Sequence, residues 1–206
     1  MKNSGSSVLF WFIIFLSACG ANSQIQNQFS LGKQALLTGN YGSALTSFRI
    51  VAEQNPNYVT DTEPVQGIWT YMGLAEYLSG NFAESRRILE KAVSQPQRTE
   101  VARLYLGLTL AHLDERRQAL KDIEAGMRGI HDFLDSMNQN YRYGIGQFYD
   151  PGRAIRSAIE REQAMIASGK IDWSQLISEG EKIGLEVEQE SDRARKQHLM
   201  DQRDQM

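Results

Sequence analysis

The side chains that could support catalysis or bind a metal are few in this chain, and they are scattered. The histidines are His112, His131 and His198, and none has cysteine, histidine or carboxylate partners at the short spacings of a metal site. The single cysteine, Cys19, lies in an N-terminal segment with another use, so no thiol nucleophile remains. The sequence therefore predicts no enzyme, no cofactor and no metal site.

Two weaker patterns in the C-terminal half could bind an anion. Gly144 and Gly146 are too few for a phosphate-binding loop, which also has to follow a strand. Arg153 and Arg156 could clamp an anion from one predicted helix, but surface arginines are common. We interpret both arginines as ordinary surface residues.

Composition limits the classes of partner. The 206 residues are 41% hydrophobic with only four prolines, which suits a folded domain with a core. The formal net charge is -3, and acidic and basic residues are intermixed. The chain therefore lacks the basic surface expected of a nucleic-acid-binding protein.

Residues 1–18 have the pattern of a signal peptide. Lys2 and the terminal amine form a positive start, and an apolar run follows over Val8–Leu16. This run is too short to cross a bilayer as a helix, which needs about 20 residues. The segment is therefore expected to be removed from the mature protein.

The end of this segment, Leu16-Ser17-Ala18-Cys19, resembles the lipobox of bacterial lipoproteins. The resemblance implies that Cys19 is diacylated, with palmitate-type chains, and becomes the first residue of the mature chain. More than one acyl chain anchors a protein stably to a membrane. Residues 19–28 are then a lipidated tether. Gly20 implies an outer-membrane address facing the periplasm under the sorting rule of enteric bacteria, a rule that differs between bacterial groups.

Three stretches share one pattern, in which a bulky residue and Gly precede a helix-breaking residue. The equivalent positions are Leu31-Gly32, Met72-Gly73 and Leu106-Gly107, then Gly39, Gly80 and Asp114, then Ala44, Ser85 and Ala119, and finally Phe48, Leu89 and Ile123. The glycines Gly73 and Gly107 are 34 residues apart. A fixed period of this length is typical of stacked helix hairpins.

With Trp69, Met72 and Gly73, the second copy resembles the W-x-x-L-G pattern of the tetratricopeptide repeat (TPR) family, with Met in place of Leu. The resemblance implies an all-α fold in which three tandem TPR-like helix hairpins form a right-handed superhelix. The repeats cover about 25–58, 66–99 and 100–133 of an array over 25–137. No stretch after the signal peptide alternates with period two, which also favours an all-α fold.

Residues 138–188 are predicted to form a C-terminal capping helix hairpin. Asp150 and Pro151 are suited to begin its first helix, as N-cap and first helical residue. Asp172 begins a pattern like a capping box at the start of its second helix. The apolar stripe then ends, so residues 189–206 are expected to form a solvated, charged tail.

In the TPR family the first helices of the repeats line a concave groove that binds a protein partner. The positions that the resemblance assigns to this groove are Phe29, Lys33, Leu37, Thr70, Leu74, Tyr77, Leu104, Leu108 and His112. This set is mostly apolar and lacks the Asn and Lys/Arg residues of TPR proteins that bind a C-terminal carboxylate. We expect a partner with apolar anchors, such as an amphipathic helix.

These resemblances together predict a lipid-anchored, periplasm-facing adaptor or scaffold that mediates protein–protein interaction in a cell-envelope assembly. The expected partners are an envelope protein and, through the lipid, the membrane, with no nucleic acid. The sequence does not decide whether the protein forms homo-oligomers. The alternative is a structural or self-associating lipoprotein whose groove is filled by its own C-terminal helix.

Overall fold

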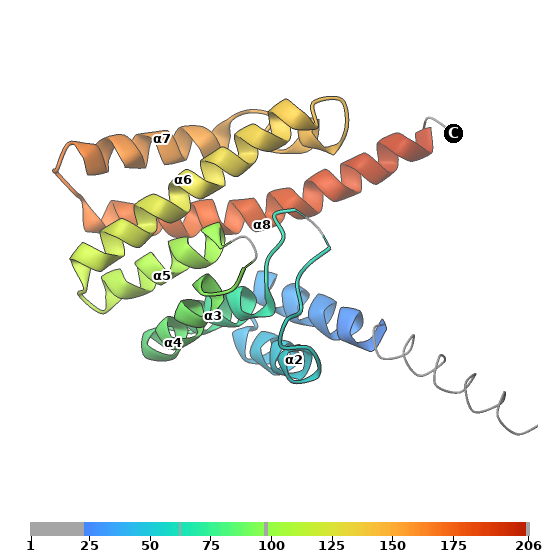
Figure 1. Ribbon diagram of the computed structural model, residues 1–206, viewed down its shortest axis with the longest axis horizontal. Helices are drawn as coiled ribbons and strands as arrows, with labels where there is room; N and C mark the ends of the chain where they lie inside the picture. The colour runs from blue at the N-terminus through green and yellow to red at the C-terminus, as the bar shows by residue number, and fades with distance from the viewer. Residues whose placement is uncertain (1–22, 62, 97–98, 205–206) are drawn as a thin grey trace, which may run out of the picture. The chain divides into compact units, whose positions relative to one another are not determined.

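The computed structural model describes residues 23–61, 63–96 and 99–204 (Figure 1). These residues are helical apart from turns, loops and one isolated antiparallel bridge between Val59 and Gly67. The prediction of an all-α fold is therefore confirmed. The predicted signal peptide and Cys19 lie outside the described residues.

The chain forms two compact units that divide after Tyr58. In the first unit, a helix that includes residues 23–37 is followed by α2 (Tyr41–Gln54). The elements of the second unit are α3 (Ile68–Leu78), α4 (Phe82–Val93), α5 (Glu100–His112), α6 (Arg116–Asn140), the 3-10 helix η1 (Ile145–Phe148), α7 (Ala154–Ala167) and α8 (Trp173–Asp204).

All three predicted hairpins turn in the same way. The breaker residue has a left-handed backbone in each, with φ of 78° at Gly39, 78° at Gly80 and 59° at Asp114. Around Gly80, its own N–H donates to the Tyr77 carbonyl and the N–H of Asn81 donates to the Glu76 carbonyl, and the same pair of bonds recurs in the other two turns. This is the Schellman arrangement that ends a helix. Asp114 therefore does in the third repeat what glycine does in the others.

The two helices of each hairpin also meet at equivalent residues. A Cβ added at Gly32 would lie 2.5 Å from a ring carbon of Phe48, and one at Gly73 would lie 2.5 Å from the Leu89 side chain. A Cβ at Gly107 would lie 2.5 Å from the backbone nitrogen of Ile123. Only glycine allows such close helix contacts. The repeated residues of the sequence thus occupy equivalent contacts within each hairpin.

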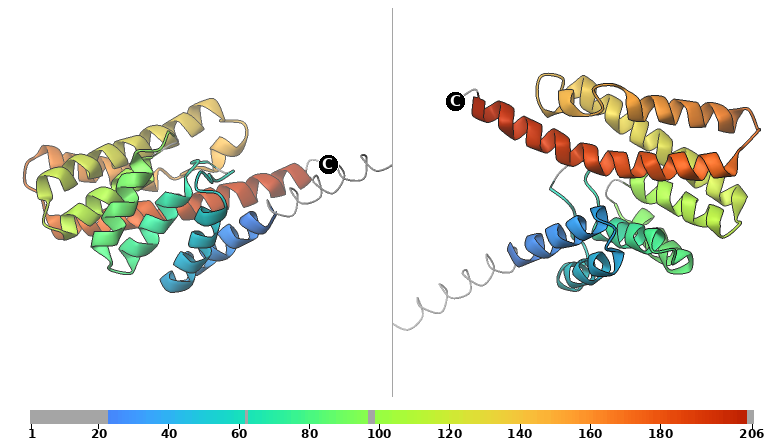
Figure 2. Two further views of the ribbon diagram at one scale, coloured as in Figure 1. Left: turned by 60° about the horizontal axis from the view of Figure 1, so that its bottom comes forward. Right: turned by 180° about the vertical axis from the view of Figure 1, so that it is seen from behind.

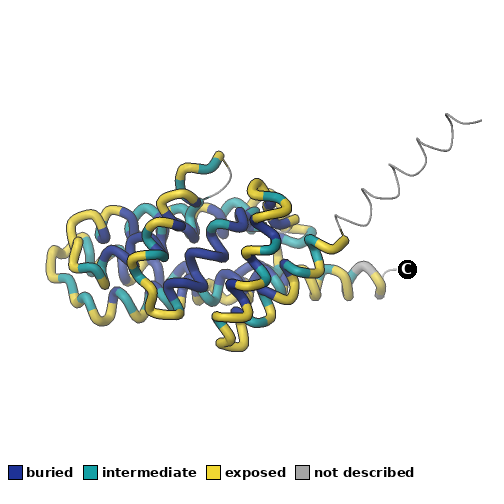
Figure 3. Tube along the Cα trace, turned by 90° about the horizontal axis from the view of Figure 1, so that it is seen from below, coloured by how far each residue is buried: buried dark blue, intermediate teal, exposed yellow. Residues whose placement is uncertain are grey.

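In the second unit, α3 packs on α4, α4 and α3 on α5, and α5 on α6. The long helix α8 runs beside α5 and α7 (Figures 1 and 2). Figure 3 shows buried positions along the interior faces of the helices and exposed positions at their turns. The predicted capping hairpin is thus formed by α7 and α8.

The start of α7 differs from the sequence prediction. The helix begins at Ala154, after Pro151, and Asp150 has a left-handed backbone with φ of 44°. The Asp150 carboxylate nevertheless caps the helix from this distance, because it accepts from the backbone N–H groups of Ile155 at 3.0 Å and Arg156 at 3.1 Å. Asp150 therefore caps the helix as predicted, but it does so with a left-handed backbone and from outside the N-cap position.

The predicted solvated tail is wrong for its first part. The helix α8 continues without a break from Trp173 to Asp204, and Glu190, Ser191 and Ala194 are buried. The Ser191 hydroxyl donates to the Glu63 carbonyl at 2.6 Å, and Glu190 accepts from the Asp150 N–H at 2.8 Å. Hydrogen bonds to loop backbone groups compensate the burial of these polar side chains, which an apolar stripe cannot predict.

The shared turn gives a first prediction. Gly80→Ala should lower the free energy of unfolding by about 1 kcal/mol, because the left-handed backbone disfavours any Cβ. Gly42→Ala is the control, since Gly42 has equally open surroundings inside α2 and lacks a positive φ. This control should raise stability by about 0.5–1 kcal/mol. Urea denaturation of both variants measures the difference, and a shift of the same sign in both would contradict the shared turn.

Candidate functional site

In the first unit, the predicted groove residues do not form one apolar surface. Phe29 is buried in the hairpin, with its ring centroid 5.9 Å from that of Phe48 and 4.9 Å from that of Tyr58. Lys33 is half-buried and Leu37 is 39% exposed. The repeat pattern predicts that Leu31 packs around Gly32. Leu31 is 47% exposed, so this prediction is wrong.

In the second unit, five of the six predicted groove residues are buried. Leu74 is 1% exposed, and Leu104 and Leu108 are fully buried. Thr70 and Tyr77 are also buried. Only His112, at the end of α5, is exposed. A protein partner cannot contact the three leucines while this packing is intact.

The helix α8 packs on one of them, Leu108. A Cβ added at Gly180 would lie 2.8 Å from a methyl carbon of Leu108, and one at Gly184 would lie 2.6 Å from the ring and hydroxyl of Tyr105. The two glycines are four residues apart and therefore share one face of α8. This face meets Leu108 and Tyr105 of α5 at close range, so α8 covers this part of the predicted groove.

Two carboxylates of α8 accept hydrogen bonds from tyrosines of α3. Tyr77 donates its hydroxyl to Glu181 Oε1 at 2.6 Å, and Tyr71 donates to Glu188 Oε2 at 3.1 Å. The Gln66 amide also donates to Glu188. Glu188 is buried, and a buried carboxylate without such donors would be costly. The tyrosines of α3 thus hold α8 at two positions seven residues apart.

An aromatic cluster closes one end of this contact. The Phe82 and His112 rings stack with centroids 4.1 Å apart and an interplanar angle of 5°, and Tyr77 lies edge-on to Tyr105 at 5.3 Å. His112 Nε2 lies 3.1 Å from the Tyr77 hydroxyl oxygen. Burial first, and then the hydrogen bond to Glu181, raise the pKa of Tyr77. The hydroxyl therefore stays protonated and keeps donating to Glu181.

Sequence reasoning missed Glu181 and Glu188 as groove contacts. Helical periodicity does not mark them, and only their position opposite Tyr77 and Tyr71 makes them acceptors. A signal for this packing was present in the glycines of α8, since glycine within a helix costs about 1 kcal/mol relative to alanine and often marks a close contact.

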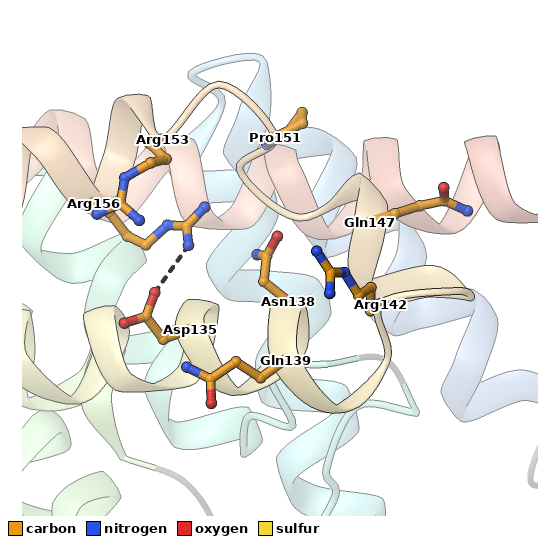
Figure 4. A pocket seen from close by; sticks show the side chains of 8 residues that line it. All are labelled: Asp135, Asn138, Gln139, Arg142, Gln147, Pro151, Arg153 and Arg156. Atoms are coloured by element: carbon orange, nitrogen blue, oxygen red, sulfur yellow. Dashed lines mark hydrogen bonds and ion pairs between the residues drawn. The ribbon is translucent and has the colours of Figure 1, made fainter.

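A polar pocket of about 690 Å³ lies between the end of α6 and the start of α7 (Figure 4). Its lining consists of Asp135, Asn138, Gln139, Arg142, Gln147, Pro151, Arg153 and Arg156. It therefore includes both arginines that the sequence left as ordinary surface residues. For Arg156 that interpretation is wrong, because its side chain is only 6% exposed.

Arg156 is held by two carboxylates. Its Nε donates to Asp150 Oδ2 at 2.9 Å, one terminal nitrogen donates to Asp135 Oδ1 at 2.9 Å, and the other donates to the Asp150 carbonyl at 2.8 Å. Burial disfavours the charged guanidinium, but the hydrogen bonds with Asp135 and Asp150 outweigh it and raise the pKa of Arg156. The Arg156 hydrogen bond lowers the pKa of Asp135. Arg156 and Asp135 are therefore both ionised at neutral pH.

The described residues contain neither a metal-binding cluster nor a helix suited to span a membrane. No group of three or more histidine, cysteine, aspartate or glutamate side chains there could hold a metal ion. In the same part of the chain, no helix is both long and apolar enough to cross a membrane.

The contact between α5 and α8 gives a second prediction. Leu108→Ala should lower the free energy of unfolding by about 2–5 kcal/mol, because it leaves a cavity in a packed core. Leu37→Ala, at a half-exposed position, should change it by about 0.5 kcal/mol or less. Denaturation curves followed by circular dichroism compare the two. A Leu108→Ala variant as stable as the parent would mean that α8 does not pack there.

Comparisons with protein-family models, curated proteins and solved structures found no match to this chain. The resemblance to the TPR family therefore stands on the repeated residues of the sequence.

Proposed function

We propose that this protein is a lipid-anchored, non-catalytic adaptor of the bacterial cell envelope. In this proposal Cys19 carries the lipid, and a TPR-like array of three hairpins in a right-handed superhelix faces the periplasm, from the outer membrane. The array binds another envelope protein. The residues 19–28 connect anchor and array.

The observation that carries the proposal is the equivalence of the three hairpins. Gly32, Gly73 and Gly107 make the same close contact, and each hairpin has the same Schellman turn. Arrays of such hairpins offer extended surfaces for binding other polypeptides. This supports a binding function over a catalytic one.

The partner surface differs from the groove that the sequence suggested. Because Leu74, Leu104 and Leu108 are buried, we propose the first hairpin as the contact. Its Leu31 is 47% exposed, whereas the equivalent Met72 and Leu106 are 7% and 6% exposed. Leu37, on the same helix, is also exposed. Apolar residues that stay exposed where the repeat buries them favour a surface completed by another protein.

The second candidate is a structural or self-associating lipoprotein. The packing of α8 on α5 favours it, because a groove filled by the same chain has no need of a partner. In that case the exposed leucines of the first hairpin would meet a second copy of this chain. The two candidates differ in what lies against Leu31.

The anchor is tested by Cys19→Ala. This variant should lose incorporation of labelled palmitate and should leave the membrane fraction after washing, because the acyl chains provide the membrane affinity. Cell fractionation with a blot for the protein measures the release, and Ser17→Ala, one of the small residues before the cysteine, is the control. Full membrane retention without labelled palmitate would contradict the lipoprotein proposal.

The partner surface is tested by site-specific photo-crosslinking in living cells. A photoreactive residue at Leu31 or Leu37 should give a crosslinked band that contains a different envelope protein, and one at the exposed Lys121 of α6 should not. Mass spectrometry identifies the band. A band that contains only this chain would favour the self-associating candidate, and no band at either leucine would reject the first hairpin as a contact.

A further inference from the structure

The pocket between α6 and α7 has a lining rich in positive charge. Three arginines line it, and Asp135 is the only acidic side chain among the lining residues. Asp150 and Glu160, which pair with Arg156 and Arg153, do not belong to the lining. The pocket surface therefore presents hydrogen-bond donors and positive charge, whereas the acidic partners Asp150 and Glu160 lie outside its lining.

Among the residues that the structure describes, Arg142 is the arginine of this pocket that has no polar partner. Within the described residues it makes no hydrogen bond or ion pair, whereas Arg153 pairs with Glu160 at 2.9 Å and Arg156 pairs with Asp135 and Asp150. Figure 4 shows the Arg142 side chain beside Asn138, at the edge of the pocket opposite Arg153 and Arg156. A guanidinium can bind a carboxylate with two parallel hydrogen bonds.

Asn138 supplies a fixed acceptor. Its Nδ2 donates to the Leu134 carbonyl at 2.9 Å and to the Tyr149 carbonyl at 2.9 Å. Both amide hydrogens are therefore used within the protein, which sets the amide orientation and leaves Oδ1 to accept from outside. The amides of Gln139 and Gln147 line the same pocket.

Arg156 and Arg153 form the rigid side. The three hydrogen bonds of Arg156 use three of the five N–H donors that a guanidinium has, so two remain. Asp150 and Arg153 both have left-handed backbones, with φ of 44° and 57°. Backbone conformations that non-glycine residues rarely adopt are concentrated at functional sites, and here two of them shape one rim.

We propose that this pocket binds the carboxylate end of a peptide. The carboxylate pairs with Arg142 and accepts hydrogen bonds from the remaining donors of Arg153 and Arg156. Asn138 Oδ1 accepts a hydrogen bond from the last peptide N–H. A peptide C-terminus offers a carboxylate and an amide N–H next to it, which matches both the guanidinium donors and the Asn138 acceptor. The site lies on surfaces that the adaptor proposal does not use, and it stands whether or not that proposal holds.

The test uses the full chain in detergent, with nitrogen-15 in its arginines, and two probes that differ in one group. The probes are N-acetyl-tri-alanine with a free carboxylate and the same peptide with a C-terminal amide. We expect a saturable shift of the Arg142 Nε–H resonance and of an Arg156 Nη–H resonance with the free acid and none with the amide. Assignment of the two resonances comes from their loss in Arg142→Gln and Arg156→Lys.

Arg142→Gln should weaken binding of the free acid at least about tenfold, as expected for the loss of a hydrogen bond to a charged group. The control is Arg161→Gln, which removes an exposed arginine of α7 that does not line the pocket, and its affinity should equal the parent's. Arg142 is exposed and unpaired, so its variant should keep the parent's melting temperature. Equal binding of acid and amide, no saturable shift in the parent, or full affinity in Arg142→Gln would each overturn the proposal.

Discussion

The packing of α8 against α5 is the interaction on which the arrangement of the second unit depends. Gly180 and Gly184 let the two helices approach until the side chains of Leu108 and Tyr105 fill the space of a missing Cβ. Leu74 and Leu104 are buried as well, so the predicted groove face of α3 and α5 becomes core instead of surface. A fold built of repeated hairpins is thereby closed on one side, and its remaining exposed surfaces have to carry any function.

Polar groups within this interface decide where α8 lies along α3. Glu181 and Glu188 meet Tyr77 and Tyr71, and a shift of the helix by one turn would leave both carboxylates without their donors. An unpaired buried carboxylate costs more than a lost apolar contact. The apolar residues thus supply most of the packing energy, and the tyrosine–glutamate pairs fix the register of α8 along α3.

The same helix links the groove to the polar pocket. Glu190 of α8 accepts from the Asp150 N–H, and Asp150 in turn holds Arg156 and caps α7. The buried arginine is therefore positioned by residues from α6, from the loop before α7 and from α8 together. Networks of this kind are stable when every member is paired, and they keep a pocket in shape without a ligand.

The sequence determined the hairpins, because each depends on contacts within about 20 residues. The spacing from Gly73 to Gly80 and to Leu89 was enough to predict the turn and the close helix contact, and even Asp114 could be aligned to its breaker position. The tertiary structure decided which faces stay exposed, because partners distant in sequence cover Leu108 and surround Arg156. Helical periodicity shows that a face is apolar, but it does not tell whether another protein or the chain's own α8 covers it.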